Sequence, residues 1–194
     1  MNGMKRIAVV GASLAGLRAV EFIRRAQFDG ELVFIGAEKH HPYDRPPLSK
    51  EMLRGETDQE RLALRRKSYD DLNLDLRLGQ RAQSLDTRTG EILLQSGDVV
   101  PYDGLVIATG GEVRRLPNQP LLEGVHVLRT LDDALAIRAA LERRPRVAVI
   151  GAGSMGEGVA VALHRAGGAR ITVVNRSPER GAALSRGFPM EGAV

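Results

Sequence analysis

The sequence contains no cysteine and no tryptophan, and only 4% of its 194 residues are aromatic. Without cysteine the chain has no disulfide, no thiol nucleophile and no cysteine-ligated zinc or iron–sulfur cluster. The shortage of aromatic rings leaves few platforms on which nucleic-acid bases could stack. Lysine and arginine (28) outnumber aspartate and glutamate (24), but these charges are scattered along the chain. We therefore do not expect a nucleic-acid partner.

Long apolar runs are missing as well. No stretch approaches the roughly 20 apolar residues that a membrane-spanning helix needs, and the N-terminus shows no signal-peptide pattern. We therefore expect a cytoplasmic protein without a membrane partner. His40 and His41 lack a third ligand at a suitable spacing, so we expect no metal site. Hydrophobic residues make up 43% of the chain, which is enough for a folded core.

A strand, a glycine turn and a helix are predicted near the N-terminus. Residues 7–10 form a continuous apolar run, typical of a strand buried on both faces. GASLAG (residues 11–16) follows, and an amphipathic stretch then runs over about 14–26. Such a turn directs backbone N–H groups at a pyrophosphate, where the helix dipole favours negative charge. Gly11 allows the tight turn and Gly16 the close approach of helix and strand. The predicted contacts are Gly11, Ser13, Leu14, Ala15 and Gly16.

The next strand gives this unit its expected ribose site. Glu31–Ile35 reads as a second parallel strand. An acidic side chain after this strand commonly binds the ribose hydroxyls of an adenine dinucleotide. Glu38 is the nearest candidate, one or two residues later than usual. A solvated loop glutamate is the alternative interpretation.

The opening pattern recurs later in the chain. Residues 146–151 repeat residues 6–11 at an offset of 140, and residues 151–156 form a complete Gly-x-Gly-x-x-Gly pattern. A helix over 155–165 and a strand over Arg170–Val174 should follow. Two such units in one chain indicate two bound dinucleotides. The predicted contacts of the second unit are Gly151, Gly153, Ser154, Met155 and Gly156.

The end of that last strand bears on the choice of nicotinamide cofactor. It is followed by Asn175, Arg176 and Ser177, with no acidic residue. An arginine and a hydroxyl at this point suit a ribose 2′-phosphate. We therefore predict that these three residues bind NAD(P)H, with NADPH favoured.

Shorter elements are predicted between the two units. A rigid proline-rich loop should lead into a helix over 48–54 that Gly55 caps, which places Lys50 about one turn inside it. Residues 55–79 are charge-rich, and we expect a helical, solvated stretch there, followed by a short strand over 74–78. Further along the chain we expect strands over 82–85, 91–95 and 99–102 in a small meander, a buried strand over 102–110, a linker over 111–124, a strand over 125–129, and a helix over Leu131–Leu141 with Thr130 as its N-cap.

Three stretches together resemble one family. GASLAG, PYDRPPLSK (residues 42–50) and IATG (residues 107–110) look like the FAD-dependent ferredoxin reductases, the flavoprotein partners of bacterial monooxygenases and dioxygenases. This family lies within the glutathione-reductase-like pyridine nucleotide-disulfide oxidoreductase superfamily. PYDRPPLSK is the discriminating stretch, because a glycine turn alone is common to many nucleotide-binding proteins. The resemblance runs from Lys5 to about Ile150.

The resemblance implies an enzyme that passes hydride from NAD(P)H to FAD and electrons on to a ferredoxin-like acceptor. The implied fold class is α/β, with two Rossmann-like three-layer units, both incomplete, and a small antiparallel β meander inserted in the first. Residues 1–112 would begin the FAD-binding domain, and residues 113–194 would be the N-terminal part of the NAD(P)-binding domain. Lys50 would be the catalytic residue, orienting or polarising the flavin. The further FAD contacts that the resemblance implies are Arg45, Pro47, Lys50, Ala82, Thr109, Gly110 and Arg129.

Several positions depart from this family. Ala37 stands where the family often has aspartate, which puts weight on Glu38. Gly158 stands where the family usually has glutamate, and Glu157 is one residue away, about 100° around a helix. Residues 153–184 look more like the NADP domain of glutamyl-tRNA reductase or shikimate dehydrogenase. Family members complete the FAD domain with a later segment, so we expect a C-terminally truncated chain that a homodimer or a partner chain would complete.

Two other functions remain open on the sequence. One is a non-catalytic or truncated nucleotide-binding fragment, which would bind cofactor weakly and reduce no dye. The other is an NADP-dependent dehydrogenase without flavin, which would leave PYDRPPLSK unexplained. Bound flavin distinguishes the ferredoxin reductase hypothesis from both.

Overall fold

The structure is a computed structural model that describes residues 3–115, 122–151, 154–166, 170–174 and 179. The chain forms two compact units, Met1–Asp44 with Ala63–Gly111, and Arg45–Leu62 with Glu112–Val194. The assignment of residues 1–112 to an FAD-binding domain and of residues 113–194 to an NAD(P)-binding domain stays a prediction. The compact units depart from that division in one segment, Arg45–Leu62, which packs with the second unit.

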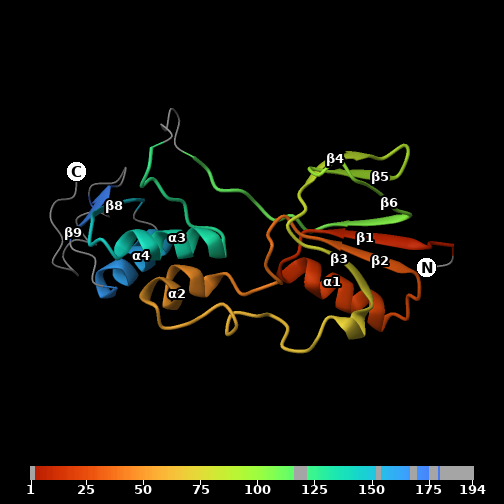
Figure 1. Cartoon of the computed structure of the whole chain (residues 1–194), viewed down its shortest axis with the longest axis horizontal. Coiled ribbons are helices and arrows are strands. Elements are labelled where there is room, and N and C mark those ends of the chain that lie inside the picture. Colours follow the sequence, from red (N-terminus) through yellow and green to blue (C-terminus); the bar gives the residue numbers. More distant parts are fainter. Residues whose placement is uncertain (1–2, 116–121, 152–153, 167–169, 175–178, 180–194) are drawn as a thin grey trace. The chain divides into compact units, whose positions relative to one another are not determined.

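A parallel four-stranded sheet forms the centre of the first unit (Figure 1). Its strand order is β3-β2-β1-β7, with β1 at Arg6–Val10, β2 at Glu31–Ile35, β3 at Leu74–Arg77 and β7 at Gly104–Ile107. The helix α1, Leu14–Arg25, follows β1 directly and connects it to β2. The predicted strand, glycine turn and helix are thus confirmed, and so is the parallel pairing of the next strand.

Both faces of β1 are buried, which explains its unbroken apolar sequence. Val9 belongs to the core cluster that includes Leu17 and Val20 of α1. Ala8 and Val10 belong to a second cluster, which includes residues of a small antiparallel sheet. Successive side chains of a strand point to opposite faces, so the first unit has three layers, with the parallel sheet in the middle.

The small sheet is the predicted antiparallel meander. Its strands are β4, Ala82–Asp86, β5, Glu91–Leu94, and β6, Val99–Pro101, in the order β4-β5-β6. Ile92 and Leu94 alternate with exposed residues and reach the core. The predicted meander is confirmed, and it covers one face of the parallel sheet.

The second unit repeats the strand–turn–helix arrangement. The two strands described there, β8 at Arg146–Ile150 and β9 at Arg170–Val174, pair in parallel, with Val149 opposite Val173. Helices α3 and α4 and a short segment from the proline-rich stretch complete it (Figure 1). The elements are η1, Pro46–Ser49, α2, Glu51–Arg54, α3, Leu131–Leu141, β8, Arg146–Ile150, α4, Ser154–Arg165, and β9, Arg170–Val174.

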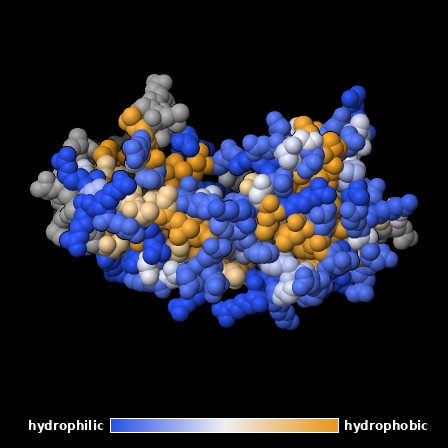
Figure 2. Space-filling model, viewed as in Figure 1, coloured by the Kyte–Doolittle hydropathy of each residue, from blue (hydrophilic) through white to orange (hydrophobic). Residues whose placement is uncertain are grey.

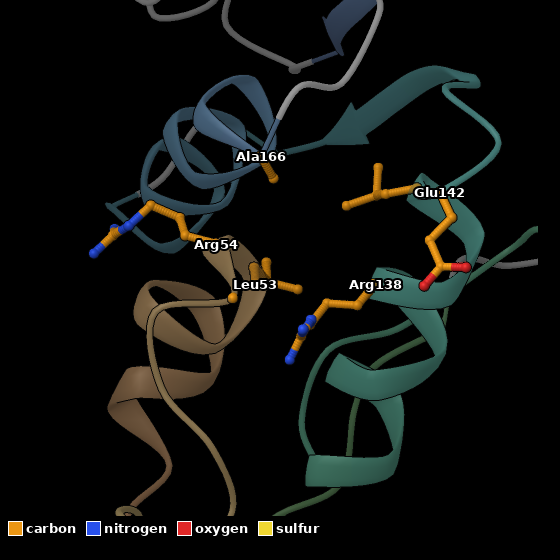
Figure 3. Close-up of a pocket in the computed structure, with 7 residues that line it drawn as sticks. Leu53, Arg54, Arg138, Glu142 and Ala166 are labelled. Atoms are coloured by element: carbon orange, nitrogen blue, oxygen red, sulfur yellow. The ribbon is translucent and has the colours of Figure 1, made fainter.

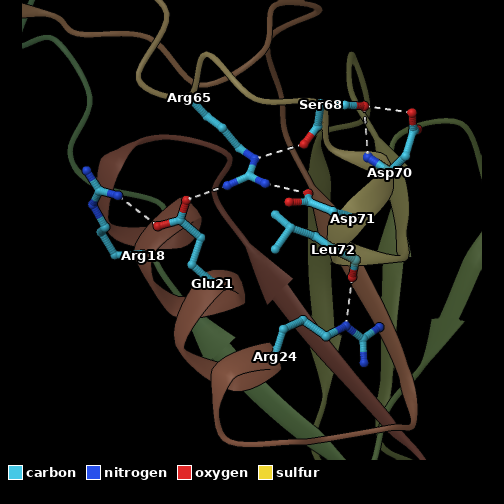
Figure 4. A network of polar contacts seen from close by, with 8 residues as sticks. All are labelled: Arg18, Glu21, Arg24, Arg65, Ser68, Asp70, Asp71 and Leu72. Carbon is cyan, nitrogen blue, oxygen red and sulfur yellow. Dashed lines mark hydrogen bonds and ion pairs between the residues drawn. The ribbon is translucent and has the colours of Figure 1, made fainter.

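The prediction of a helical stretch over 55–79 is wrong. The only helical turn described there is the 3-10 turn η2, Asp70–Leu72. Arg65 is not on a solvated face either, since only 10% of its side chain is exposed. Its guanidinium forms ion pairs with Glu21 of α1, at 3.0 Å, and with Asp71 (Figure 4). These contacts with another element fix the segment in an irregular path.

Three further predictions need correction. The strand over 125–129 is absent, since this segment pairs with no strand in the described residues and leads into Thr130, the N-cap of α3. The predicted buried strand β7 is half-buried, since it lies at an edge of the described sheet, and Ile107 is 65% exposed. The helix predicted over 48–54 is divided at Lys50, whose ψ of −100° separates η1 from α2.

Within the described ranges, no helix is both long enough and apolar enough to cross a membrane. Histidine and acidic side chains form no cluster of three or more suited to a metal ion in those same ranges. On the face drawn in Figure 2, hydrophilic residues cover much of the surface of each unit, and apolar residues form separate patches among them.

Candidate functional site

The glycine turn of the first unit leaves no room for side chains at two positions. Gly11 has a φ of +117°, and a Cβ atom there would lie 2.1 Å from the carbonyl oxygen of Ala108. A Cβ atom on Gly16 would lie 1.9 Å from the carbonyl oxygen of Gly11 and 2.9 Å from the ring of Phe34. The start of α1 is therefore packed directly on the end of β1, as the sequence predicted.

The N-terminus of α1 is suited to an anion. Ser13 is the N-cap, in extended conformation, and its side chain makes no capping hydrogen bond. The first turn carries no acidic residue, so nothing on the helix opposes its positive end. Leu14 and Ala15 are exposed, and they do not bury this end of the helix. These features fit a pyrophosphate held by main-chain amides.

The end of β7 lies beside this turn. The amide of Ala108 donates to the carbonyl of Val10, at 2.7 Å, and continues the pairing of β7 with β1. Thr109 and Gly110 follow, both exposed, and Gly110 has a φ of +68°. The structure thus brings the predicted contacts Thr109 and Gly110 to the same edge of the sheet as the glycine turn.

Glu38 lies in the loop after β2. The amide of Gly79 donates to the Glu38 carbonyl, at 2.9 Å, and the Tyr43 hydroxyl donates to Oε2 of Glu38, at 2.5 Å. The side chain is half-buried, whereas Ala37 is exposed. A freely solvated loop glutamate is therefore not what the structure shows. Ala82, one of the predicted FAD contacts, is the first residue of β4 and packs against the second core cluster.

The sequence prediction gave Tyr43 no role, although the residue lies within PYDRPPLSK. Its ring is buried, and its hydroxyl contacts the side chain predicted to bind ribose. The available signal was an aromatic hydroxyl five residues after the acid, in a loop stiffened by proline.

The second glycine turn shares a positive φ and two backbone contacts with the first. Gly151 has a φ of +107°, and a Cβ atom on Gly156 would lie 1.9 Å from the carbonyl oxygen of Gly151. The amide of Gly151 donates to Val174 at the end of β9, at 2.7 Å, just as the amide of Gly11 donates to Ile35 at the end of β2, at 2.8 Å. The two copies of the sequence repeat therefore share these backbone contacts.

Part of the second site lies outside the described residues, namely Gly153, Asn175, Arg176 and Ser177. Ser154 and Met155 are the first residues of α4. Glu157 is exposed in the first turn of that helix, while Gly158 is half-buried with open space around its Cβ direction. The acidic side chain in the first turn makes this helix end less favourable to an anion than that of α1.

The proline-rich stretch contributes residues to the second unit. The Arg45 guanidinium donates to the carbonyl oxygen of Arg129, at 2.7 Å, so these two predicted FAD contacts lie together. A capping box fixes the same segment, because Asp133 accepts from the amides of Arg129 and Thr130, while its own amide donates to the Thr130 hydroxyl. Thr130 is thus confirmed as the N-cap of α3.

Lys50 lies at the junction of η1 and α2, and Pro47 lies within η1. The Lys50 amide donates to the carbonyl of Pro47, at 3.1 Å, and the Lys50 side chain is exposed. Its ammonium group forms no hydrogen bond or ion pair with the part of the chain that the structure describes. The backbone of Lys50 is fixed, and its charge is available to a ligand.

A pocket of about 210 Å³ lies in the second unit between α2, α3 and α4 (Figure 3). In Figure 3 the side chain of Arg138 extends toward Leu53, whereas Arg54 points away from the pocket. Arg54 pairs with Glu56, at 2.6 Å. None of the predicted contact residues lines this pocket, and we assign it no role in dinucleotide binding.

Comparison with known proteins shows the family to which the sequence is similar. The model of the pyridine nucleotide-disulphide oxidoreductases matches residues 5–189. The ferredoxin–NAD(+) reductase component of the p-cumate 2,3-dioxygenase system from Pseudomonas putida is 40% identical over 162 residues, which are 82% of this chain and 40% of that protein. The corresponding component of the anthranilate 1,2-dioxygenase system from Burkholderia cepacia is 40% identical over 170 residues, 86% of this chain and 41% of that protein.

Solved structures show the same likeness. The ferredoxin reductase for the CYP199A2 system from Rhodopseudomonas palustris matches with a TM-score of 0.80 and 33% identity, over 93% of this chain and 48% of that one. The covalent putidaredoxin reductase–putidaredoxin complex matches with a TM-score of 0.76 and 30% identity, over 94% of this chain and 47% of the matched chain. The chain spans about two fifths of the length of the curated relatives and about half of these solved chains.

Proposed function

The chain belongs to the pyridine nucleotide-disulphide oxidoreductase family, and from that premise we propose that it provides the FAD-binding and NAD(H)-binding units of a ferredoxin–NAD(+) reductase. The observation that carries the proposal is the repeated glycine turn, in which Gly16 and Gly156 each lie against the carbonyl oxygen of the preceding turn. One turn would hold the pyrophosphate of FAD, and the other that of the nicotinamide dinucleotide.

When bound, FAD supplies a ring that accepts a hydride and releases electrons one at a time. The chain's own residues would bind and orient it. Gly11 and Gly16 would let the start of α1 pack on the end of β1, so that main-chain amides face the pyrophosphate, and Glu38 would accept hydrogen bonds from the adenosine ribose. Lys50, with its fixed backbone and exposed ammonium, would place a positive charge beside the flavin ring.

The names of the relatives and the sequence pattern point to different nicotinamide cofactors, and we adopt the one in the names, NAD(H). Both relatives are ferredoxin–NAD(+) reductase components by name, which supports NAD(H) for this chain against the sequence-based preference for NADPH. Asn175, Arg176 and Ser177, on which that preference depends, lie outside the described residues. The electron acceptor would be a ferredoxin-type protein, since the relatives are named as ferredoxin reductases. A cytoplasmic location and a homodimer or partner chain remain expectations from the sequence.

Flavin fluorescence and dye reduction test this proposal together. We expect the purified chain to quench the fluorescence of added FAD, and the complex to reduce ferricyanide faster with NADH than with NADPH. Quenching without dye reduction would support a non-catalytic nucleotide-binding chain instead. NADPH binding without any flavin change would favour a flavin-free dehydrogenase.

A further inference from the structure

We propose that Tyr43 is a positioning residue for the adenosine half of FAD, because its hydroxyl holds the Glu38 carboxylate in the orientation that the ribose requires. This inference rests on the proposed function, since it concerns FAD bound by the first unit. Both residues belong to that unit.

The position of the Tyr43 hydroxyl is set by the packing of its own segment. The side chain is only 6% exposed. The backbone of Tyr43 pairs with Ala63 in an isolated antiparallel bridge. The carbonyl of the neighbouring Pro42 accepts a hydrogen bond from the amide of Leu64, at 3.0 Å. The ring of His40 lies edge-on to the tyrosine ring, with the centroids 6.3 Å apart. A buried ring with these neighbours directs its hydroxyl to one place.

The backbone of Glu38 is fixed from the other direction. The amide of Gly79 donates to the Glu38 carbonyl, and the amide of Gly36 donates to Arg77 at the end of β3, both at 2.9 Å. The amide of Gln80 donates in turn to the Gly36 carbonyl, at 2.8 Å. The loop after β2 is therefore anchored to the chain that leaves β3 through backbone hydrogen bonds.

The Tyr43 hydroxyl holds the Glu38 side chain through its 2.5 Å hydrogen bond to Oε2. A carboxylate can accept about four hydrogen bonds, so one bond from a hydroxyl leaves acceptor capacity for ribose. Glutamate has more rotatable bonds than aspartate, and holding it in place before the ligand arrives reduces the entropy lost on binding. Ala37 offers no acid of its own, so ribose recognition by this loop would depend on Glu38 alone.

Tyr43→Phe tests the inference, because it keeps the ring and removes only the hydroxyl. We expect the dissociation constant for FAD to rise about tenfold, as for a lost hydrogen bond to a charged group. Tyr69→Phe is the matched control in the same unit, since the Tyr69 hydroxyl has no partner among the described atoms. This variant should bind FAD as tightly as the wild-type chain.

A double-mutant cycle separates positioning from a general structural role. If Tyr43 acts through Glu38, then Tyr43→Phe should weaken FAD binding in the wild-type chain and have no further effect in Glu38→Ala. An equal loss in both backgrounds would overturn the inference, as would unchanged FAD affinity in Tyr43→Phe alone. Either result leaves the proposed function intact if the wild-type chain binds FAD. A wild-type chain that binds no FAD would contradict the proposed function and this inference together.

Discussion

Gly16 lies so close to the carbonyl oxygen of Gly11 that a Cβ atom on Gly16 would be 1.9 Å away from it. Because the obstacle is backbone, an added methyl group must displace either the helix or the turn. Gly156 and Gly151 have the same relationship in the second unit. This repeated contact gives each proposed dinucleotide site its own test.

Gly16→Ala should weaken FAD binding by at least tenfold and lower the free energy of unfolding by about 2 kcal/mol, as an overpacked contact does. Gly156→Ala should leave FAD binding unchanged and abolish NADH-dependent reduction. Fluorescence titration with FAD and stopped-flow reduction with NADH measure the two effects separately. If both variants lose the same function, the assignment of one dinucleotide to each turn is wrong.

Gly158→Ala is the control for these substitutions. It lies in α4, and a Cβ atom there would meet nothing within 4 Å. Since alanine favours a helix by about 1 kcal/mol over glycine, this variant should be as stable as the wild-type chain or more so. Urea unfolding measures the difference.

Arg24 should be needed for the stability of the first unit. Its guanidinium donates to four carbonyl oxygens, at 2.7 to 2.9 Å, and burial lowers the pKa of this arginine. Lysine cannot reproduce this fork of donors. Arg24→Lys should therefore lower the free energy of unfolding by about 2 kcal/mol. Urea unfolding checks this, and Arg25→Lys, at an exposed neighbouring position, should change little.

The ion pairs of Glu21 should make stability depend on pH. Burial alone would raise the pKa of Glu21, but hydrogen bonds and charges from Arg18 and Arg65 outweigh it, so the pKa lies below its ordinary value of 4.5 (Figure 4). A lowered pKa contributes stability that is fully present above the unfolded-state pKa and is lost as pH falls through the folded-state pKa. Glu21→Gln should therefore cost about 2 kcal/mol near pH 7 and much less near pH 3.

Thermal unfolding of the wild-type chain and Glu21→Gln across this range measures the difference. Glu60→Gln is the control, because Glu60 is exposed and forms no ion pair with any described residue. A Glu21 effect that stays constant from neutral to acidic pH would show that packing, and not charge, accounts for it.

Lys50→Met should slow reduction by NADH more than it weakens FAD binding. The substitution keeps most of the side-chain length and removes the charge proposed to lie beside the flavin ring. We expect the rate of reduction to fall at least tenfold with FAD affinity changed by less than threefold, as for a loss of electrostatic orientation. Lys67→Met, at an exposed position of the first unit, is the control. Equal reduction rates in the two variants would remove Lys50 from the proposed site.

Local patterns in the sequence predicted the parts of the fold that depend on neighbouring residues. The apolar run of β1 and the glycine turn after it specify a buried strand and a tight connection, whatever lies elsewhere in the chain. The same pattern identified the second unit, and the N-cap Thr130 identified the start of α3. These features are set within a few residues, so a single sequence reveals them.

The errors arise where distant contacts decide the conformation. Arg65 lies in a charge-rich stretch that reads as helical, but its ion pair with Glu21, 44 residues away, holds it in an irregular segment. Val125 and its neighbours have the composition of a strand, but the chain there leads to a helix cap. The contact between Tyr43 and Glu38 depends on how the loop folds back. No periodicity in the sequence reports such contacts.

The most direct test of the account is the visible absorption spectrum of the chain after incubation with FAD, removal of free flavin and anaerobic addition of NADH. We predict that flavin absorption stays with the protein and bleaches when NADH is added. A colourless protein after removal of free flavin would contradict the proposal that the first glycine turn holds FAD.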